Sequence, residues 1–260
     1  MKRMNFNYHT HTSLCGHATG EMIEYIQRAI DGGIIYMGFS DHMPYAFADE
    51  SAQGQRMTSK EAKDYVADIR RLRELYKNKI DIKIGFEMEY YPDKFHEMLE
   101  FARNIGAEYL ILGQHYMRGI FTGGFHVING KATDEDLKNY VNDVISAMES
   151  GVFTYIAHPD MIHYQGSEEL YEKEMRRLCI ASKRTNIPIE ISGQGIRDNR
   201  IYPADRFWAI AGEVGCPVTI GFDAHSADAA CDRESVEKVK QLIGKYNLDY
   251  IGKPALRPIN

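Results

Sequence analysis

The unit that decides the fold is clearest in the stretch Ile34-Ile35-Tyr36-Met37-Gly38-Phe39-Ser40-Asp41-His42. Its first six residues are mainly β-branched, aromatic or otherwise apolar, which favours a short buried strand, and polar side chains follow at once. A helical pattern then covers Ser59–Lys77, and a second β-type run covers Ile80–Glu87. Short strands that alternate with longer helices are typical of parallel βαβ architecture.

The same pattern of strand and helix recurs seven times along the chain. Strands are predicted at Phe6–His9, Ile34–Phe39, Ile80–Glu87, Tyr109–His115, Phe153–His158, Pro188–Ile191 and Val218–Asp223. Helices are predicted at Glu21–Asp31, Ser59–Lys77, Asp93–Asn104, Asp134–Glu149, Ser167–Arg184, Ala204–Glu213 and Arg233–Lys245. Because α/β barrels of about 200–250 residues fold as one unit, we expect the 260 residues to form a single domain, 1–260.

The composition is that of a globular cytosolic protein. Apolar residues make up 44% of the chain, enough for a substantial core, and no stretch approaches the roughly 20 consecutive apolar residues of a membrane helix. The N-terminal residues lack the apolar core of a signal peptide, so a cytoplasmic location is expected. The four cysteines are scattered without a CxxC pair, which argues against a disulfide framework or a cysteine-rich zinc site.

The net charge of −6 argues against binding to long nucleic acid, which draws on clustered Lys and Arg. It does not exclude a small phosphorylated substrate, because bound metal ions create a local positive field. Two glycine-bearing loops, Ala46–Thr58 and Arg118–Lys131, follow strands and are longer than usual. In a barrel, loops of this kind surround the opening of the active site.

Potential metal ligands end six of the seven predicted strands. In chain order they are His9, His11, His17, His42, Glu87, His115, His158, Asp223 and His225. The strands of a parallel barrel end at one rim, where active sites lie, so we expect these side chains to meet. Any one histidine is more often an ordinary hydrogen-bonded residue than a ligand, but repetition at strand ends favours a metal site.

The chemistry of this set indicates transition metals. Imidazole together with carboxylate suits Zn, Mn or Fe, whereas Ca and Mg prefer mostly oxygen ligands. Nine ligands are too many for one tetrahedral ion, because catalytic zinc takes three protein ligands and a water. We therefore expect two or three divalent ions, with Glu87 bridging a pair.

Other polar residues near the strand ends allow more than one interpretation. Glu190, near the end of the sixth strand, could orient a metal ligand or pair with an arginine. Arg197, in the segment 197–200, could bind a phosphate through two parallel hydrogen bonds or lie on the surface. His163 and His126 could each contact a substrate, and a surface position agrees equally well with the sequence.

Six motifs stand in order along nearly the whole chain. They are Tyr8-His9-Thr10-His11-Thr12, Gly38-Phe39-Ser40-Asp41-His42, Gly85-Phe86-Glu87, His115, Ala157-His158-Pro159-Asp160 and Gly221-Phe222-Asp223-Ala224-His225-Ser226. This set resembles the polymerase and histidinol phosphatase (PHP) family, most closely its monofunctional histidinol-phosphate phosphatases. The resemblance implies an α/β fold of the distorted (β/α)7 TIM-like barrel type, with a trinuclear metal site.

The resemblance also implies roles for the site residues. The first ion would be held by His9, His11, Glu87 and Asp223, the second by Glu87, His115 and His158, and the third by His17, His42 and His225. The implied reaction is hydrolysis of L-histidinol phosphate in histidine biosynthesis, by a hydroxide that bridges two ions. The catalytic residues would be Glu87, Asp223 and His225, and the substrate contacts would be Arg197 and His163.

The sequence departs from the family pattern at two places that concern substrate recognition. The family commonly has an arginine after the fifth-strand histidine, where this chain has His163, and Ser-Val-His where it has Gly113-Gln114-His115. A PHP-type phosphoesterase acting on nucleotides or single-stranded nucleic acid ends is therefore a second interpretation. A non-catalytic barrel that senses metal is a third, which the complete ligand set disfavours.

Overall fold

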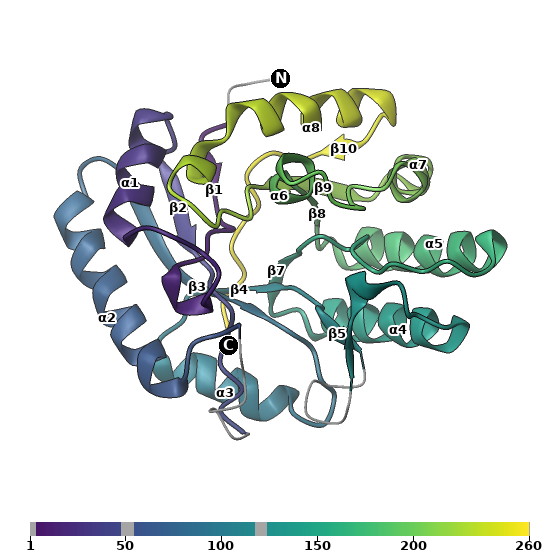
Figure 1. Cartoon of the computed structure of the whole chain (residues 1–260), viewed down its shortest axis with the longest axis horizontal. Helices are drawn as coiled ribbons and strands as arrows, with labels where there is room; N and C mark the ends of the chain where they lie inside the picture. Colours follow the sequence, from purple (N-terminus) through teal and green to yellow (C-terminus); the bar gives the residue numbers. More distant parts are fainter. Residues whose placement is uncertain (1–3, 48–54, 118–123, 260) are drawn as a thin grey trace.

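The computed structural model describes residues 4–47, 55–117 and 124–259. Within them, eight parallel strands form a strongly curled sheet in the order β1-β2-β3-β4-β7-β8-β9-β10, and helices surround its outer face (Figure 1). The strands are β1 (Phe6–Asn7), β2 (Tyr36–Phe39), β3 (Asp81–Met88), β4 (Tyr109–Leu112), β7 (Phe153–Ile156), β8 (Ile189–Ser192), β9 (Pro217–Gly221) and β10 (Asp249–Tyr250). The long helices are α1 (Met22–Asp31), α2 (Ser59–Tyr76), α3 (Phe95–Ile105), α4 (Asp134–Ser150), α5 (Glu168–Thr185), α7 (Asp205–Val214) and α8 (Arg233–Lys245).

The α/β barrel-like fold predicted from the sequence is confirmed, since all seven predicted strands and seven predicted helices are present with ends shifted by a few residues. The sheet has an eighth strand, β10, that the sequence did not reveal, because two residues carry no periodicity. The short helix α6 (Gly193–Arg197) and the antiparallel pair β5 (Tyr116–Met117) and β6 (Phe125–His126) were not predicted either. The two long loops fall partly outside the described residues.

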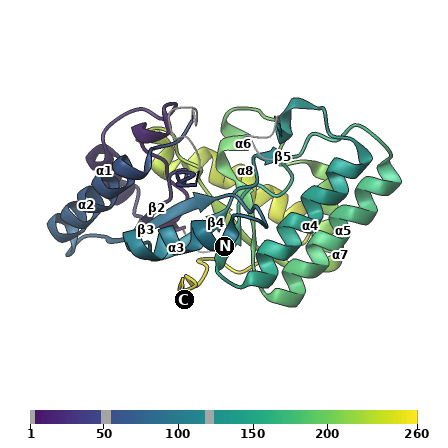
Figure 2. The same ribbon diagram turned by 90° about the horizontal axis from the view of Figure 1, so that it is seen from below.

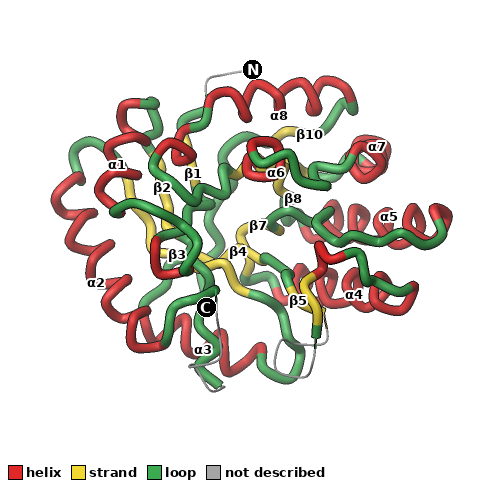
Figure 3. The backbone as a smooth tube through the Cα atoms, in the orientation of Figure 1, coloured by secondary structure: helices red, strands yellow, loops and turns green. Residues whose placement is uncertain are grey.

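The view in Figure 2 separates the two rims of the sheet. β5 and α6 lie on one side of the molecule, and the C-terminal tail lies on the other. The tube in Figure 3 shows the strands in yellow at the centre, with loops in green connecting them to the surrounding helices. Among the described residues, none of the helices is both long and apolar enough to traverse a membrane.

Glycines in two of the sequence motifs make room for one buried tyrosine. The Tyr109 hydroxyl donates a hydrogen bond to the Tyr8 carbonyl at 2.9 Å, and this places its ring against β2 and β3. A Cβ at Gly38 would lie 2.2 Å from the Tyr109 hydroxyl oxygen, and one at Gly85 would lie 2.3 Å from its ring. The close approach therefore requires glycine at both positions, just before the strand ends that carry His42 and Glu87.

The first and the ninth strand are joined at their carboxyl ends by a parallel bridge between Thr10 and Ala224. The His11 N–H donates to the Ala224 carbonyl at 2.9 Å, and the Ala224 N–H donates to the His9 carbonyl at 3.1 Å. These bonds join segments more than 210 residues apart in the chain. They set His9 and His11 directly beside Asp223 and His225, which flank Ala224.

Asp160 holds the loop after β7 against the start of α7. Its carboxylate is buried and accepts hydrogen bonds from the Ala204 N–H at 2.6 Å and the Trp208 indole N–H at 3.0 Å. Burial raises the pKa of Asp160 to about 6 despite these bonds. The contact fixes the backbone two residues beyond His158.

The Asp160→Ala variant is expected to lose about 2–4 kcal/mol of unfolding free energy, because two buried N–H groups lose their acceptor. Asp160→Asn keeps one acceptor oxygen and is uncharged, so its loss is expected to stay within about 1 kcal/mol. Urea unfolding of both variants at neutral pH checks this. Equal losses in the two variants would show that the bonds to Ala204 and Trp208 do not stabilise the fold.

Candidate metal centre

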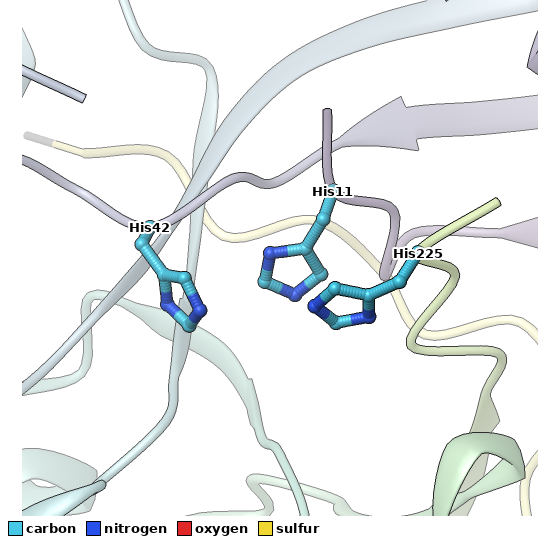
Figure 4. Close-up of side chains that lie close together, drawn as sticks. All are labelled: His11, His42 and His225. Carbon is cyan, nitrogen blue, oxygen red and sulfur yellow. The ribbon is translucent and has the colours of Figure 1, made fainter. Parts of the chain in front are cut away.

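The nine candidate ligands all lie at the carboxyl rim of the sheet. A parallel sheet ends all its strands at one edge, so residues that follow different strands meet there. Seven of the nine are buried, namely His9, His11, His42, Glu87, His115, His158 and Asp223. His225 is partly buried, and His17 lies at the exposed side. Figure 4 shows the rings of His11, His42 and His225 converging from three different segments.

Glu87 stands at the centre of the cluster. Five imidazole nitrogens lie within 3.6 Å of its carboxylate oxygens, from His158 (2.9 Å), His42 (3.1 Å), His11 (3.4 Å), His115 (3.5 Å) and His9 (3.6 Å). Gly113 leaves the room for this carboxylate, because a Cβ there would lie 1.9 Å from Glu87 Oε1. Burial raises the pKa of Glu87, but the surrounding histidines outweigh it and hold that pKa well below its usual value. Glu87 is therefore a carboxylate that can bridge two cations.

Asp223 is the second carboxylate at the centre of the cluster. Its Oδ1 lies 3.3 Å from His11 Nε2, 3.4 Å from His225 Nδ1 and 3.5 Å from His9 Nε2. Burial raises its pKa, but His9 and its neighbours outweigh this effect and hold the pKa well below its usual value. The carboxylate is thus shared by histidines from the segment after β1 and from the segment after β9.

Outer carboxylates fix which nitrogen of each inner histidine carries the proton. His9 Nδ1 lies 2.8 Å from Glu190 Oε2, and His11 Nδ1 lies 3.3 Å from Asp41 Oδ1. Since a carboxylate only accepts, both Nδ1 atoms donate, and the lone pair of each neutral ring is on Nε2. The two Nε2 atoms face each other at 3.2 Å. Two lone pairs at this distance repel unless a cation or a proton lies between them.

Further features fit a metal ion at this place. Glu87 Oε2 and His115 Nδ1 are buried, and among the described residues no well-aligned hydrogen bond reaches either. Groups of ligand atoms within 4.8 Å of one another include His9, His11 and Asp223, and also His9, Glu87 and His158. A mixed set of imidazoles and carboxylates suits divalent transition metals. The donor set therefore fits the predicted cations.

Two of the candidate ligands are held in a strained backbone conformation. His158 has a φ of 30° and Asp223 a φ of 49°, both in the left-handed region. The other described non-glycine residues in this region are Asn186, Asn199 and Asn247, a residue type that tolerates it. Strain at residues that aim side chains into a cleft is typical of functional sites, because the surrounding packing must hold it in place.

The charge states of the histidines also favour cation binding. Burial lowers the pKa of His42 and of His115 to about 3, so both rings are neutral near pH 7. Burial and the neighbouring His11 lower the pKa of His225 to about 2. For His9, burial acts in the same direction, but Glu190, Asp223 and Glu87 outweigh it and raise the pKa to about 10. A divalent cation held by His9 would take the place of this proton.

A cavity of about 310 Å³ opens above these ligands. Besides seven of the candidate ligands, it is lined by Gln55, Arg56, Tyr116, His126, Ile128, Asn129, Met161, Gln194 and Arg200. Arg56 and Arg200 supply positive charge from two different segments. A volume of this order is at the small end for sites that bind small molecules.

The two predicted substrate contacts lie away from this cavity. Arg197 donates to the Phe222 carbonyl at 3.4 Å and to the Asp223 carbonyl at 3.1 Å, and lines a separate cavity beside α1. His163 Nδ1 lies 3.3 Å from the Ile128 carbonyl. The structure instead brings Arg200, three residues after Arg197, to the cavity. Arg197 supports the backbone of Asp223 and lies outside the cavity above the candidate ligands.

Sequence reasoning missed several residues of the site. Asp41 is buried, accepts from the Thr12 N–H at 2.9 Å and orients His11, although its place beside His42 in the second motif was a usable signal. Arg56 comes from a loop without periodicity, so only the packing places it at the cavity. His126, for which a substrate contact and a surface position were both open, lines the cavity from β6. Glu190, for which two roles were open, lies against His9 and not against an arginine.

Replacement of Glu190 by glutamine is expected to weaken metal binding about 10–100-fold. A glutamine amide can donate to His9 Nδ1 as readily as it can accept from it. If the amide donates, the proton of the neutral ring lies on Nε2, and this nitrogen has no lone pair left to bind a metal. Glu213→Gln is the matched control, because Glu213 is an exposed partner of Arg176. Zinc titration against a competing chelator measures both. An unchanged affinity in Glu190→Gln would mean that the outer carboxylate does not set the tautomer of His9.

Comparison with known proteins agrees with this geometry. Residues 7–194 match the family profile described as "PHP domain". Over 248 residues the chain is 27% identical to a Deinococcus radiodurans protein named "Probable histidinol-phosphatase", which covers 91% of this chain and 93% of the relative. A Schizosaccharomyces pombe protein of the same name is 24% identical over 258 residues, with 85% and 81% covered.

A solved structure is similar over almost the whole chain. It is the histidinol phosphate phosphatase of Lactococcus lactis in complex with zinc, L-histidinol and phosphate. The TM-score is 0.73 and the identity 19%, with 98% of this chain and 97% of the other covered. At this identity the likeness concerns the fold.

Proposed function

Because the chain belongs to the PHP domain family, we propose that it is a metal-dependent phosphomonoesterase that hydrolyses L-histidinol phosphate to L-histidinol and phosphate. The observation that carries the proposal is the carboxylate of Glu87 with five imidazole nitrogens around it, at the floor of a small cavity. The names of the two curated relatives, and the ligands of the similar structure, support this substrate.

Three ions are assigned to the rim. The first is assigned to His9, His11, Glu87 and Asp223, the second to Glu87, His115 and His158, and the third to His17, His42 and His225. When bound, such ions lower the pKa of water and neutralise charge on phosphoryl oxygens. Zn, Mn and Fe all suit this ligand set.

The whole chain, 1–260, is assigned to one PHP domain. The family profile ends at residue 194, but β9 and β10 lie beyond it and belong to the same sheet. Asp223 and His225 follow β9, so the proposed metal centre needs this last part of the chain.

The chain's own side chains would bind the phosphate and move the proton. Arg200 lines the cavity. When the Gln194 amide is oriented so that its nitrogen donates to Asp223, the Gln194 oxygen accepts from Arg200 at 3.2 Å. A guanidinium in this place suits phosphoryl oxygens. Asp223 Oδ1 and His225 Nδ1 are 3.4 Å apart, and we assign to this pair the passage of a proton from the attacking water to the leaving alkoxide.

The proposed function is tested on a panel of phosphoesters with Zn, Mn or Fe supplied, by measuring release of phosphate or, from DNA, of nucleotides. The panel contains histidinol phosphate, a mononucleotide bisphosphate and single-stranded DNA. The expected result is a kcat/KM for histidinol phosphate well above that of the other compounds, and rescue of histidine auxotrophy in a strain that lacks the phosphatase. No release from any monoester with metals bound would end the proposal.

Arg200 and Arg197 form a matched pair for a test of substrate binding. Arg200→Ala is expected to raise the KM about 10-fold with little change in metal content, since a charged hydrogen bond to the phosphate is lost. Arg197→Ala is expected to lower metal content and thermal stability, because Arg197 supports the Asp223 backbone. Steady-state kinetics and elemental analysis of both variants check this. An unchanged KM in Arg200→Ala would remove Arg200 from the phosphate site.

A further inference from the structure

Cys15 lies directly beside the outer edge of the metal centre. It ends the short 3-10 helix η1 (Ser13–Cys15), which follows β1 and begins after the Thr12 cap. The next residue, Gly16, has a φ of 76° and its N–H donates to the Ser13 carbonyl at 3.0 Å. This left-handed turn favours glycine and reverses the chain, so that Cys15 and His17 come to the same place. Cys15 is completely buried.

Three potential ligand atoms converge at this turn. The Cys15 sulfur and one ring nitrogen each of His17 and His225 lie within 4.8 Å of one another. His225 comes from the segment after β9, about 210 residues further along the chain, so the local turn alone does not create the group. This group contains one thiol and two imidazoles, whereas the groups His9, His11 and Asp223 and His9, Glu87 and His158 contain only nitrogen and oxygen donors. The Cys15 sulfur also lies within 4.8 Å of ligand atoms of His11 and Asp41, on the inner side of the turn.

The hydrogen bonds of His17 and His225 leave the lone pair of each ring on Nε2, facing the other ring. His17 Nδ1 lies 2.9 Å from the Cys15 carbonyl, which only accepts, so this nitrogen carries the proton. His225 Nδ1 lies 3.2 Å from the Asp223 carbonyl, and 3.1 Å from the Gln194 oxygen when that amide donates to Asp223. Each neutral ring therefore has its lone pair on Nε2, and the two Nε2 atoms are 3.0 Å apart. This contact is repulsive unless a cation or a proton lies between them.

We propose that Cys15 binds, as a thiolate, the cation held by His17 and His225, and makes this outer position selective for thiophilic metals. The inference rests on the proposed metal-dependent function and adds a ligand to its third ion. Thiolate and imidazole ligands together select Zn, Co or Fe over Mn and Mg. The first and second positions, to which only carboxylate and imidazole ligands are assigned, accept a wider range of metals.

Cobalt substitution tests the proposal, because a cobalt–thiolate bond gives a near-ultraviolet charge-transfer band that nitrogen and oxygen ligands do not give. Chelator-stripped protein is reloaded with Co²⁺, and absorption and bound cobalt are measured. The wild type is expected to show the band. Cys15→Ser is expected to lose the band and one equivalent of tightly bound cobalt. Cys231→Ser, a second buried cysteine outside the group, is the matched control and should keep both.

A second measurement on the wild type needs no variant and so does not depend on how Cys15→Ser folds. Zinc X-ray absorption is expected to show a sulfur neighbour at about 2.3 Å. The proposal is overturned by a wild type without the band at full cobalt occupancy, by a band that persists in Cys15→Ser, or by zinc without a sulfur neighbour. If the protein hydrolysed histidinol phosphate but showed no sulfur ligand, the proposed function would still hold, and only the role of Cys15 as a metal ligand would be rejected. If the protein bound no cobalt or zinc, both would fail.

Discussion

Glu87→Gln is expected to abolish tight binding of two of the proposed ions and to lower phosphatase activity by about 10³-fold, or about 4 kcal/mol. The substitution keeps the shape of the side chain and removes one negative charge. That charge faces imidazoles from the ends of four different strands. No other carboxylate among the described residues is surrounded in this way.

The physical reason is the burial of the site. Glu87 is only 2% exposed, so water cannot replace the lost charge. A neutral amide would also place N–H donors against the imidazole lone pairs that should face the metal. We therefore expect the Glu87→Gln variant to lose metal ions while it still folds.

Elemental analysis and initial rates, with far-ultraviolet circular dichroism as a check on the fold, measure the effect. Glu97→Gln is the control, because Glu97 is an exposed residue of α3 paired with Lys94. Full metal content and near-normal rates in Glu87→Gln would contradict both the bridging role and the proposed mechanism.

The metal-free protein is expected to be most stable near pH 6.5 and to lose stability on both sides. On the acid side, the folded state keeps His42 and His115 neutral down to a pKa of about 3, whereas the unfolded chain protonates them from about 6.5. Their contribution is present above pH 6.5 and is lost as the pH falls toward 3. Each such group changes the unfolding free energy by about 1.4 kcal/mol per pH unit.

On the alkaline side the sign reverses. Glu190, Asp223 and Glu87 outweigh the effect of burial and raise the pKa of His9 to about 10, so the folded state keeps a proton that the unfolded chain loses near 6.5. The contribution of His9 is present below pH 6.5 and is lost as the pH rises toward 10. Carboxylates raise the pKa of His11 and His158 as well, against the effect of burial.

Urea midpoints from pH 4 to 10, with and without a chelator, measure this profile. Protein with metals bound is expected to lose the alkaline decline, because a metal ion takes the place of the His9 proton. A stripped protein whose stability does not fall above pH 7 would mean that the carboxylates around His9 do not hold a proton in the folded state.

The local elements of the fold were readable from the sequence. The run Ile34–Phe39 and the helix Ser59–Lys77 follow from residue periodicity, which acts over neighbouring residues. That Glu87 and His115 should share one rim followed from the parallel arrangement alone, since all strands end at one edge. The family motifs depend on the same short-range order, and the family is confirmed.

The contacts between distant segments were decided only by the tertiary structure. The sequence indicated an arginine near the cavity, but whether Arg197 or Arg200 faces it depends on the turn of the five-residue helix α6. The partners of His9 and His11 are Glu190 and Asp41, 181 and 30 residues away in the chain. Periodicity contains no information about which distant side chains meet, because that depends on the register of the strands and the packing of the whole sheet.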